Sequence, residues 1–258
     1  MMVTCRLYGR MANQMLQIAA TVGYARRYNL PYHIPATTIN PNTWPPRFTH
    51  LTNNNYDAKL PTIVLRETTH AYQEMKFDLT WSNLNIVIDG YRQSLKYFEH
   101  CLAEVRRAFP FTYSFNKNTV GLHVRIGDYK LYPDHHPVIA DIYISRALSL
   151  MQRKGLTDIH VFSDSIEECT TRINQQIYPG FTFTYSDPRS TDRYDFQSLL
   201  SCEHFIISNS TFSLMAAILS ESPGKIVISP SKDKWFGPSN RHLDTSDLIP
   251  TDFIQIDY

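Results

Sequence analysis

Three side chains that could do chemistry stand together where a short apolar run ends. Residues 120–129 read V-G-L-H-V-R-I-G-D-Y, and the alternation up to residue 124 is the period-two pattern of a β-strand. The run presents His123, Arg125 and Asp128, an imidazole, a guanidinium and a carboxylate. Ligands of open α/β sheets bind outside the carboxyl ends of the strands. The segment therefore indicates a ligand site, although a strand, a glycine turn and a solvated ion pair explain it equally well.

Two further strand-to-helix turns carry polar groups that suit an oxygen-rich ligand. Residues 9–14 (G-R-M-A-N-Q) precede a helix, where Asn13 and the free backbone N–H groups could meet such a ligand. Residues 208–213 (S-N-S-T-F-S) place Ser210 and Thr211 at a second helix start, whose unpaired N–H groups and dipole bind phosphate. The same side chains could instead do no more than cap their helices.

The chemistry that these groups suit is the binding of a diphosphate without a metal. A planar guanidinium makes bidentate contacts with phosphate, so Arg125 and the 208–213 turn could together hold a diphosphate leaving group. Metal-dependent sugar-nucleotide transferases commonly present a D-x-D pair, and the chain contains none. Asp134, His135 and His136 are adjacent in sequence, but neighbouring side chains diverge, and an exposed loop is the simpler interpretation.

The elements that must position these groups alternate between strand and helix in both halves of the chain. Strands are predicted at 3–8, 84–88, 120–124, 159–162, 181–185, 204–207 and, as the last of its unit, 226–229. Helices are predicted at 11–27, 95–109, 141–154, 192–201 and 214–219, and another begins at Ser165, which has capping-box spacing to Glu168. Residues 35–62 form a long irregular loop. The alternation predicts two Rossmann-like units facing one another.

The composition indicates which binding partners and which cellular compartment to expect. A net charge of +1 gives no reason to expect nucleic acid or an anionic membrane as a partner. The chain has no apolar window long enough to span a membrane, and its first residues lack the pattern of a signal peptide. The four cysteines form no C-x-x-C pair, which argues against zinc and against a disulfide framework. We therefore expect a cytoplasmic protein.

Five segments, in order along the chain, resemble the α-1,2-fucosyltransferases of glycosyltransferase family 11. G-R-M-A-N-Q-M at residues 9–15 resembles G-R-L-G-N-Q-M, and G-Y-R-Q-S-L-K-Y-F at 90–98 resembles G-Y-F-Q-S-E-K-Y-F. H-V-R-I-G-D at 123–128 resembles H-x-R-R-x-D, and V-F-S-D-S-I-E at 161–167 resembles V-F-S-D-D-I-E. Residues 202–213 resemble C-K-H-x-I-I-S-N-S-T-F-S. Each segment alone is weak, but their number and order are specific.

The resemblance implies a GT-B-like α/β fold with two facing Rossmann-like domains. Residues 112–118 are the best candidate for the junction, giving an N-terminal domain at 1–114 on the acceptor side and a C-terminal, GDP-sugar-binding domain at 115–258. The implied activity is that of a galactoside 2-alpha-L-fucosyltransferase, an inverting enzyme that moves L-fucose from GDP-β-L-fucose to a galactose-containing glycan. GDP-fucose is then a substrate, and neither a cofactor nor a metal is expected.

The resemblance also assigns roles to residues. Arg125 would contact the β-phosphate and support catalysis, and His123 would contact the donor nucleotide. Asp195 falls where the related α-1,6- and protein O-fucosyltransferases keep an aspartate near the guanine. The remaining donor contacts fall at two helix starts: Asn13, Ser210, Thr211 and Phe212. Of these, Ser210 and Thr211 would bind phosphate oxygens, and Asn13 would reach the donor from the opposite domain.

Some points stay open at this stage. Asp128 is the carboxylate nearest in sequence to the expected phosphate site and could be the general base, or it could organise its loop; Asp89 and Glu67 are other candidates. Ile126 stands where the family signature has its second arginine. The alternatives to the implied activity are a transferase of the same fold that uses another GDP-sugar or acceptor, and an inactive GDP-binding relative.

Overall fold

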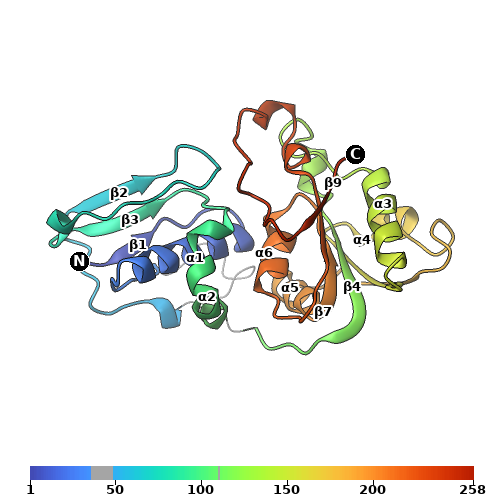
Figure 1. Cartoon of the computed structure of the whole chain (residues 1–258), viewed down its shortest axis with the longest axis horizontal. Helices are drawn as coiled ribbons and strands as arrows, with labels where there is room; N and C mark the ends of the chain where they lie inside the picture. The colour runs from blue at the N-terminus through green and yellow to red at the C-terminus, as the bar shows by residue number, and fades with distance from the viewer. Residues whose placement is uncertain (36–48, 110) are drawn as a thin grey trace. The chain divides into compact units, whose positions relative to one another are not determined.

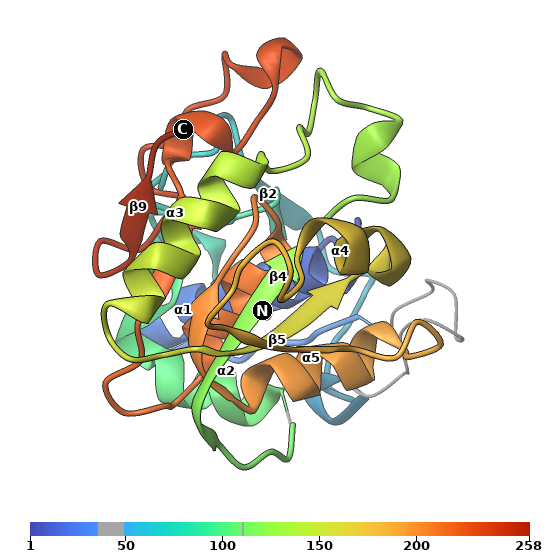
Figure 2. The same ribbon diagram turned by 90° about the vertical axis from the view of Figure 1, so that its right-hand side faces the viewer.

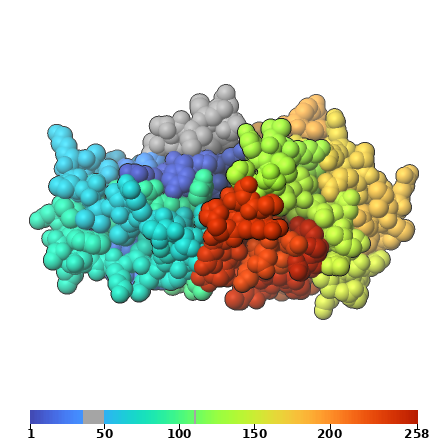
Figure 3. Space-filling model, turned by 90° about the horizontal axis from the view of Figure 1, so that it is seen from above, coloured from blue at the N-terminus to red at the C-terminus, as the bar shows by residue number. Residues whose placement is uncertain are grey.

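The chain folds into two α/β units, each built around its own parallel β-sheet (Figure 1). This computed structural model describes residues 1–35, 49–109 and 111–258. Unit 1 comprises Met1–Phe111 and Ser246–Leu248, and unit 2 comprises Thr112–Thr245 and Ile249–Tyr258. In the space-filling view, the colour runs from blue at the N-terminal residues of unit 1 to red at the C-terminal residues of unit 2 (Figure 3).

Unit 1 holds a three-stranded parallel sheet with the strand order β1-β3-β2. Its strands and helices are β1 (Val3–Cys5), α1 (Met11–Arg27), β2 (Thr62–Arg66), β3 (Asn85–Asp89) and α2 (Leu102–Ala108). The apolar stripe of α1 packs on the sheet, with Met15, Ile18 and Val22 fully buried. The helix ends where Asn29 takes a left-handed conformation (φ 53°), ahead of a proline.

Unit 2 holds a six-stranded parallel sheet with the order β6-β5-β4-β7-β8-β9. The strands are β4 (Asn116–Val124), β5 (Asp158–Ser163), β6 (Thr182–Tyr185), β7 (Cys202–Ile206), β8 (Val227–Pro230) and β9 (Ile254–Ile256). The helices are α3 (Asp141–Gln152), α4 (Ile166–Arg172), α5 (Asp192–Leu200) and α6 (Thr211–Leu219). The two parallel sheets confirm the predicted mixed α/β class.

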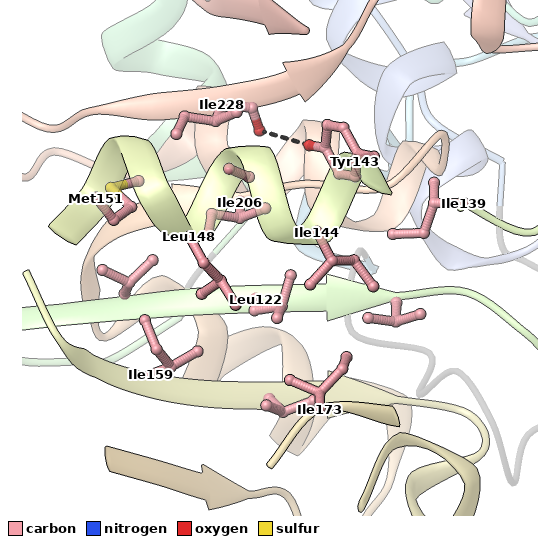
Figure 4. Close-up of a cluster of buried hydrophobic side chains, with 14 of the residues drawn as sticks. Leu122, Ile139, Tyr143, Ile144, Leu148, Met151, Ile159, Ile173, Ile206 and Ile228 are labelled. Atoms are coloured by element: carbon pink, nitrogen blue, oxygen red, sulfur yellow. Dashed lines mark hydrogen bonds between the residues drawn. The ribbon is translucent and has the colours of Figure 1, made fainter. Parts of the chain in front are cut away.

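Helices cover both faces of this sheet, and α3 and α5 lie on opposite sides of β4 and β5 (Figure 2). On the α3 face, Leu148 packs with Leu122 and Ile159 in a continuous apolar cluster (Figure 4). The Tyr143 hydroxyl in that cluster donates to the carbonyl of Ile228, 3.2 Å away (Figure 4). On the α5 face, Gly121 lets a leucine of α5 approach β4, because a Cβ there would lie 2.5 Å from its Cδ1 atom.

The strand order reverses between β4 and β7. From β4 the chain adds β5 and β6 on one side, then crosses to add β7, β8 and β9 on the other. Loops that follow strands on the two sides of such a reversal diverge, which opens a crevice at the carboxyl edge of the sheet. We call the carboxyl edge of the unit 2 sheet where β4 and β7 end the crevice of unit 2.

Several predicted elements differ in the structure. A strand at 62–66, β2, was not predicted, and β9 follows the strand expected to be last in its unit. The single helix predicted at 95–109 is two short 3-10 turns at Leu95–Tyr97 and Glu99–Cys101 followed by α2. The N-cap Ser165 makes no side-chain cap bond, so the predicted capping box does not form; Glu168 pairs with Lys130 and Arg172 instead.

The long loop predicted at residues 35–62 falls largely on residues 36–48, which lie outside the described residues. Within the described ranges, no helix has the length and apolar character needed to cross a membrane.

Candidate ligand-binding site

His123 lies at the carboxyl end of β4 and is almost entirely buried, with 5% of its surface exposed. Its Nδ1 atom lies 2.8 Å from the Ser208 hydroxyl and 3.1 Å from the Ser213 hydroxyl. Its ring stacks on Phe212, with 5.1 Å between the ring centres. Ser208 lies in the turn that leads from β7 into α6, and Phe212 and Ser213 lie in the first turn of α6. The imidazole therefore joins the two strands that border the crevice.

The His123 imidazole is neutral at physiological pH. Burial, with a smaller effect from the nearby Arg125 guanidinium, lowers its pKa from 6.5 to about 3. The cause is the cost of placing a charged ring out of water. Both hydrogen bonds use Nδ1, so Nε2 is the ring nitrogen left for a ligand, either to donate or to accept.

Arg125 reaches the same edge and is held by two carboxylates. Its Nε atom donates to Asp128 Oδ1 at 3.0 Å, and Nη2 lies 2.8 Å from the same oxygen. Its Nη1 atom pairs with Asp164 Oδ2 at 3.2 Å. The guanidinium also lies over the ring of Tyr129, 5.9 Å from its centre. The side chain of Arg125 is 16% exposed, so an anion in the crevice could reach it.

Asp164 is a site residue to which the sequence analysis gave no role. It follows β5, whose last residue Ser163 is in register with Val124 of β4. Its Oδ1 atom accepts the Ile126 N–H at 2.9 Å while Oδ2 pairs with Arg125. Gly127 allows this approach, because a Cβ there would lie 2.4 Å from Asp164 Oδ2. The available signal was its place in the family-like segment V-F-S-D-S-I-E at 161–167, but its role also depends on β5 lying next to β4, which needs the strand order.

Some side chains of the 208–213 turn are buried and hold the local structure, and others are partly exposed. Ser208 and Ser213 are fully buried against the imidazole. Ser210 is the N-cap of α6, and its hydroxyl accepts the Phe212 N–H at 3.4 Å, so the capping interpretation holds for this residue. Thr211 and Phe212 are half-buried in the first turn of α6. The helix start thus offers backbone N–H groups beside Arg125 and His123.

Asp195 lies in the first turn of α5, which packs against α6. Burial is the main cause that raises the pKa of its carboxyl, with the nearby acidic side chains of Asp192 and Asp187 adding to it. Its Oδ1 atom is buried and has no hydrogen-bond partner among the described residues. The next residue, Phe196, meets Phe212 edge to face at 5.2 Å. A buried acceptor without a donor is costly, and a ligand N–H would satisfy it.

A layer of rings supports the crevice from the loop after β4. The Tyr129 hydroxyl donates to the Asn209 carbonyl at 2.9 Å, and its ring stacks on His136 at 5.0 Å. Asn209 in turn donates to the carbonyls of Pro137 and Trp235. The sequence analysis expected residues 134–136 in an exposed loop. This is correct for Asp134 and His135, but His136 is half-buried, because its ring packs on Tyr129.

Asn13 belongs to unit 1, whereas the other candidate donor contacts belong to unit 2. It lies inside the first turn of α1, whose N-cap is Arg10, so it does not cap that helix. Its Oδ1 atom faces the Gln93 amide at 3.5 Å. Gly9, at φ 76°, leaves room for it, since a Cβ there would lie 2.7 Å from Asn13 Nδ2. The Asn13 amide is thus oriented by its own loop.

The other two candidate bases are engaged within unit 1. Glu67 accepts the backbone N–H groups of Tyr91 and Arg92 at 2.6 and 2.9 Å. Asp89 pairs with Arg6 at 3.0 Å and lies 3.8 Å from Arg66. These contacts give Glu67 a role in holding the backbone.

The arrangement in unit 2 is suited to binding an anionic ligand that also carries a ring with N–H groups. It combines a guanidinium, a helix start and a neutral imidazole, with a buried carboxylate nearby that can accept N–H groups. Within the described part of the chain, no three histidine, cysteine, aspartate or glutamate side chains lie close enough together to hold a metal ion.

Comparison with known proteins places this site in a family context. The family model described as glycosyl transferase family 11 matches residues 1–237. The chain is 32% identical over 136 residues to the Escherichia coli O-antigen biosynthesis glycosyltransferase WbnK, a match that covers 51% of this chain and 44% of that protein. It is 28% identical over 152 residues to the Bos taurus galactoside alpha-(1,2)-fucosyltransferase 1, covering 55% and 42%. The chain thus matches less than half the length of either relative.

Among solved structures, a mutant of Arabidopsis thaliana FUT1 in complex with GDP is similar to this chain. It superposes with a TM-score of 0.50 at 12% identity, over 87% of this chain and 69% of that one. At this identity the likeness concerns the fold. It supports the GT-B-type architecture that the sequence resemblance implied.

Proposed function

The chain belongs to glycosyltransferase family 11, and from that membership we propose that it transfers L-fucose from GDP-β-L-fucose to the O2 hydroxyl of a terminal galactose. The reaction inverts the anomeric carbon and gives an α-1,2 linkage. The similarity to a galactoside alpha-(1,2)-fucosyltransferase supports the choice of donor, acceptor and linkage. The site geometry supports the mode of catalysis.

The observation that carries the proposal is the convergence of three groups at the reversal of strand order in unit 2. Arg125 ends β4, the start of α6 follows β7, and His123 is hydrogen-bonded between them. This is where an open α/β sheet binds a nucleotide, and a guanidinium beside a helix start is the combination that a diphosphate requires. We assign the diphosphate to Arg125 and to the start of α6 at Ser210 and Thr211.

In the proposed reaction, the bond between the anomeric carbon and the β-phosphate oxygen breaks, and GDP leaves with the bonding electrons. The acceptor oxygen forms the new bond from the opposite face, and its proton passes to a base. Negative charge therefore grows on the departing diphosphate, next to Arg125. Fixed charges aimed at such developing charge lower the barrier.

Arg125 is already paired with Asp128 and Asp164, so the diphosphate has to replace at least one carboxylate. The side chain of Asp164 is less exposed than that of Asp128, 23% against 36%. We therefore assign the displaced position to Asp128. Before the donor binds, Asp128 organises the loop. To serve as the general base, its displaced carboxylate has to reach the face of the sugar opposite the diphosphate.

The other donor contacts follow from the same placement. His123 Nε2 faces the nucleotide as a neutral donor or acceptor. Asp195 Oδ1 accepts hydrogen bonds from the guanine N–H groups, and this would give that buried oxygen the donor it lacks among the described residues. Asn13, in unit 1, stays a predicted donor contact. We assign no metal to the reaction, because Arg125 and the helix start supply the positive charge that stabilises the diphosphate.

The deciding experiment is GDP release from GDP-fucose with lactose as acceptor, in the presence of EDTA. We expect turnover, and a product with fucose on O2 of galactose by NMR. Turnover that EDTA abolishes contradicts the metal-free mechanism. Turnover with another GDP-sugar but not with GDP-fucose, or GDP binding without transfer to any glycan, overturns the assignment of substrate or of activity.

A further inference from the structure

The carboxyl edge of the small sheet in unit 1 carries a second polar and aromatic cluster. It is formed by the loops that follow β1, β2 and β3, which end side by side because the strands are parallel. Tyr8 and Tyr91 meet edge to face, with 5.0 Å between ring centres, and His70 lies 6.2 Å from Tyr91. All three residues are half-buried, so each is partly accessible to solvent. We call Tyr8, His70 and Tyr91, with Asp89, the unit 1 edge cluster.

The loop that carries Tyr91 is held in an unusual backbone conformation. Gly90 has φ 146°, and Arg92, which is not a glycine, has φ 51°. Glu67 accepts the N–H groups of both Tyr91 and Arg92. Behind them, the buried Arg92 guanidinium donates to the Leu65 carbonyl at 2.8 Å. Left-handed conformations of non-glycine residues are costly and occur mainly where a side chain must be presented in a fixed way.

The charges of the edge cluster do not suit an anion. Asp89 is paired with Arg6 and lies near Arg66, so both guanidinium groups face a carboxylate. Burial is the main cause that raises the pKa of the Tyr8 hydroxyl to about 12, and the nearby Asp89 and Glu67 raise it further. Tyr8 therefore stays a neutral hydroxyl beside carboxylates. Such a surface has its charges largely paired and offers hydrogen bonds to a neutral ligand that is rich in hydroxyl groups.

One further observation at this edge points to a missing donor. Gln93 is 7% exposed, and its Oε1 atom is buried without a hydrogen-bond partner among the described residues. Its amide nitrogen faces Asn13, which we assign to the donor. A hydroxyl group of a ligand could satisfy this acceptor after a small side-chain movement. Gln93 thus stands between the edge cluster and the residue expected to approach GDP-fucose.

We infer that the unit 1 edge cluster is the subsite that binds the terminal galactose of the acceptor. A galactose ring has its axial hydroxyl on one face and C–H groups on the other. The C–H face packs on an aromatic ring, whose face is electron-rich, here that of Tyr91. The hydroxyl groups bond to Asp89, Arg6 and the Tyr8 hydroxyl. This inference rests on the proposed function for the identity of the sugar, but not for the position of the subsite.

The test measures sugar binding without turnover. Lactose is titrated by saturation-transfer NMR into the protein saturated with GDP, for the wild type and for Tyr91→Leu and Tyr8→Leu. Loss of one stacked ring is expected to weaken lactose binding about tenfold, while the GDP dissociation constant changes less than twofold. Cellobiose, which differs at the axial hydroxyl, is expected to bind weakly in every case.

Tyr56→Leu is the matched control, because Tyr56 is a unit 1 tyrosine outside the edge cluster whose ring stacks on His33 at 4.3 Å. It should bind lactose as the wild type does. Lactose binding that survives in both Tyr91→Leu and Tyr8→Leu overturns the inference, as does a wild type that binds no galactoside. If Tyr91→Leu fails to bind GDP, its fold is in question, and Tyr8→Leu decides. If the variants lose lactose binding but the wild type transfers no fucose, the subsite is supported and the proposed function is refuted.

Discussion

Arg125 is held between two carboxylates, so an incoming diphosphate competes with them for the guanidinium. We expect Arg125→Ala to lose about 10² to 10³ in kcat, because it removes a fixed charge that stabilises the leaving group. The measurement is GDP release at saturating GDP-fucose. Arg153→Ala, which alters an exposed arginine of unit 2, is the control and should keep full activity. An Arg125→Ala protein that is folded and keeps more than a tenth of the wild-type rate refutes the assignment.

Asp195 is expected to select guanine. Its buried Oδ1 atom lacks a donor, and hydrogen bonds to charged groups contribute about 1.5–3 kcal/mol. Asp195→Ala should therefore weaken GDP binding about 10- to 100-fold. The loss should be smaller for IDP, whose base lacks the exocyclic amine. Calorimetric titration with both nucleotides measures this, and Asp192→Ala, an exposed aspartate of the same helical turn, is the matched control. Equal losses for GDP and IDP would place Asp195 away from the exocyclic amine.

His123 should make the stability of the protein depend on pH. Its pKa of about 3 in the folded state lies below the ordinary value of 6.5, so between these values the unfolded chain binds more protons. The free energy of unfolding therefore rises with pH in this window, by up to about 1.4 kcal/mol per pH unit, and this contribution is complete above pH 6.5.

Urea unfolding of the wild type and of His123→Asn at pH 4.5 to 7.5 measures this effect. The variant should show the shallower slope, since other titrating groups are common to both proteins. His242→Asn changes an exposed histidine and should leave the slope as it is. Parallel slopes for the wild type and His123→Asn would contradict a buried, neutral His123.

At the scale of elements, the loop after β4 and the loop after β5 are in direct contact. Gly127 leaves room for the Asp164 carboxylate to approach. In Gly127→Ala the new Cβ would lie 2.4 Å from Asp164 Oδ2, and the carboxylate has to move away from Arg125. We expect kcat to fall about tenfold or more, with the free energy of unfolding changed by less than about 1 kcal/mol, because the atom displaced is a side-chain end.

A double-mutant cycle separates this effect from a general disturbance of the loop. Gly127→Ala is combined with Asp164→Asn, and kcat is measured for all four proteins. If Gly127→Ala acts through Asp164, the double variant should be no worse than the poorer single variant. Strictly additive losses in activation free energy would mean that the two residues act independently.

The element scale also shows which parts of the site could be predicted from the sequence. His123 and Arg125 were recognisable because a period-two run ends in polar residues, and the 208–213 turn because it joins a strand to a helix. Parallel strands bring such carboxyl ends to one edge, so these predictions needed little knowledge of topology. Asp164 escaped because its role depends on β5 adjoining β4, a long-range pairing. β9, of three residues, is too short to show a period.

The serine hydroxyls illustrate a further limit of local pattern. Ser208, Ser210 and Ser213 all belong to the hydroxyl-rich 208–213 turn, of which only Ser210 and Thr211 were predicted to bind phosphate. In the structure Ser210 caps α6, and Ser208 and Ser213 face His123. The imidazole comes from a strand 85 residues away from Ser208, and no local spacing encodes which hydroxyl group would meet it.

At the scale of the whole molecule, the two units have different surfaces at the carboxyl edges of their sheets. Unit 2 presents a guanidinium and a helix start, and unit 1 presents rings and matched charges. We therefore expect GDP and lactose to protect different segments from hydrogen exchange. GDP at 100 times its dissociation constant stabilises the folded state by about 2.7 kcal/mol, so amides that exchange only through unfolding of unit 2 should slow about a hundredfold.

The measurement is hydrogen–deuterium exchange by mass spectrometry, with peptides that cover residues 120–130, 205–215 and 62–72. GDP alone should protect the first two segments and leave residues 62–72 unchanged. Lactose added to the GDP complex should protect residues 62–72, because the loop after β2 carries Glu67 and His70 of the edge. Protection of residues 62–72 by GDP alone would mean that the nucleotide, and not the acceptor sugar, occupies the edge of unit 1.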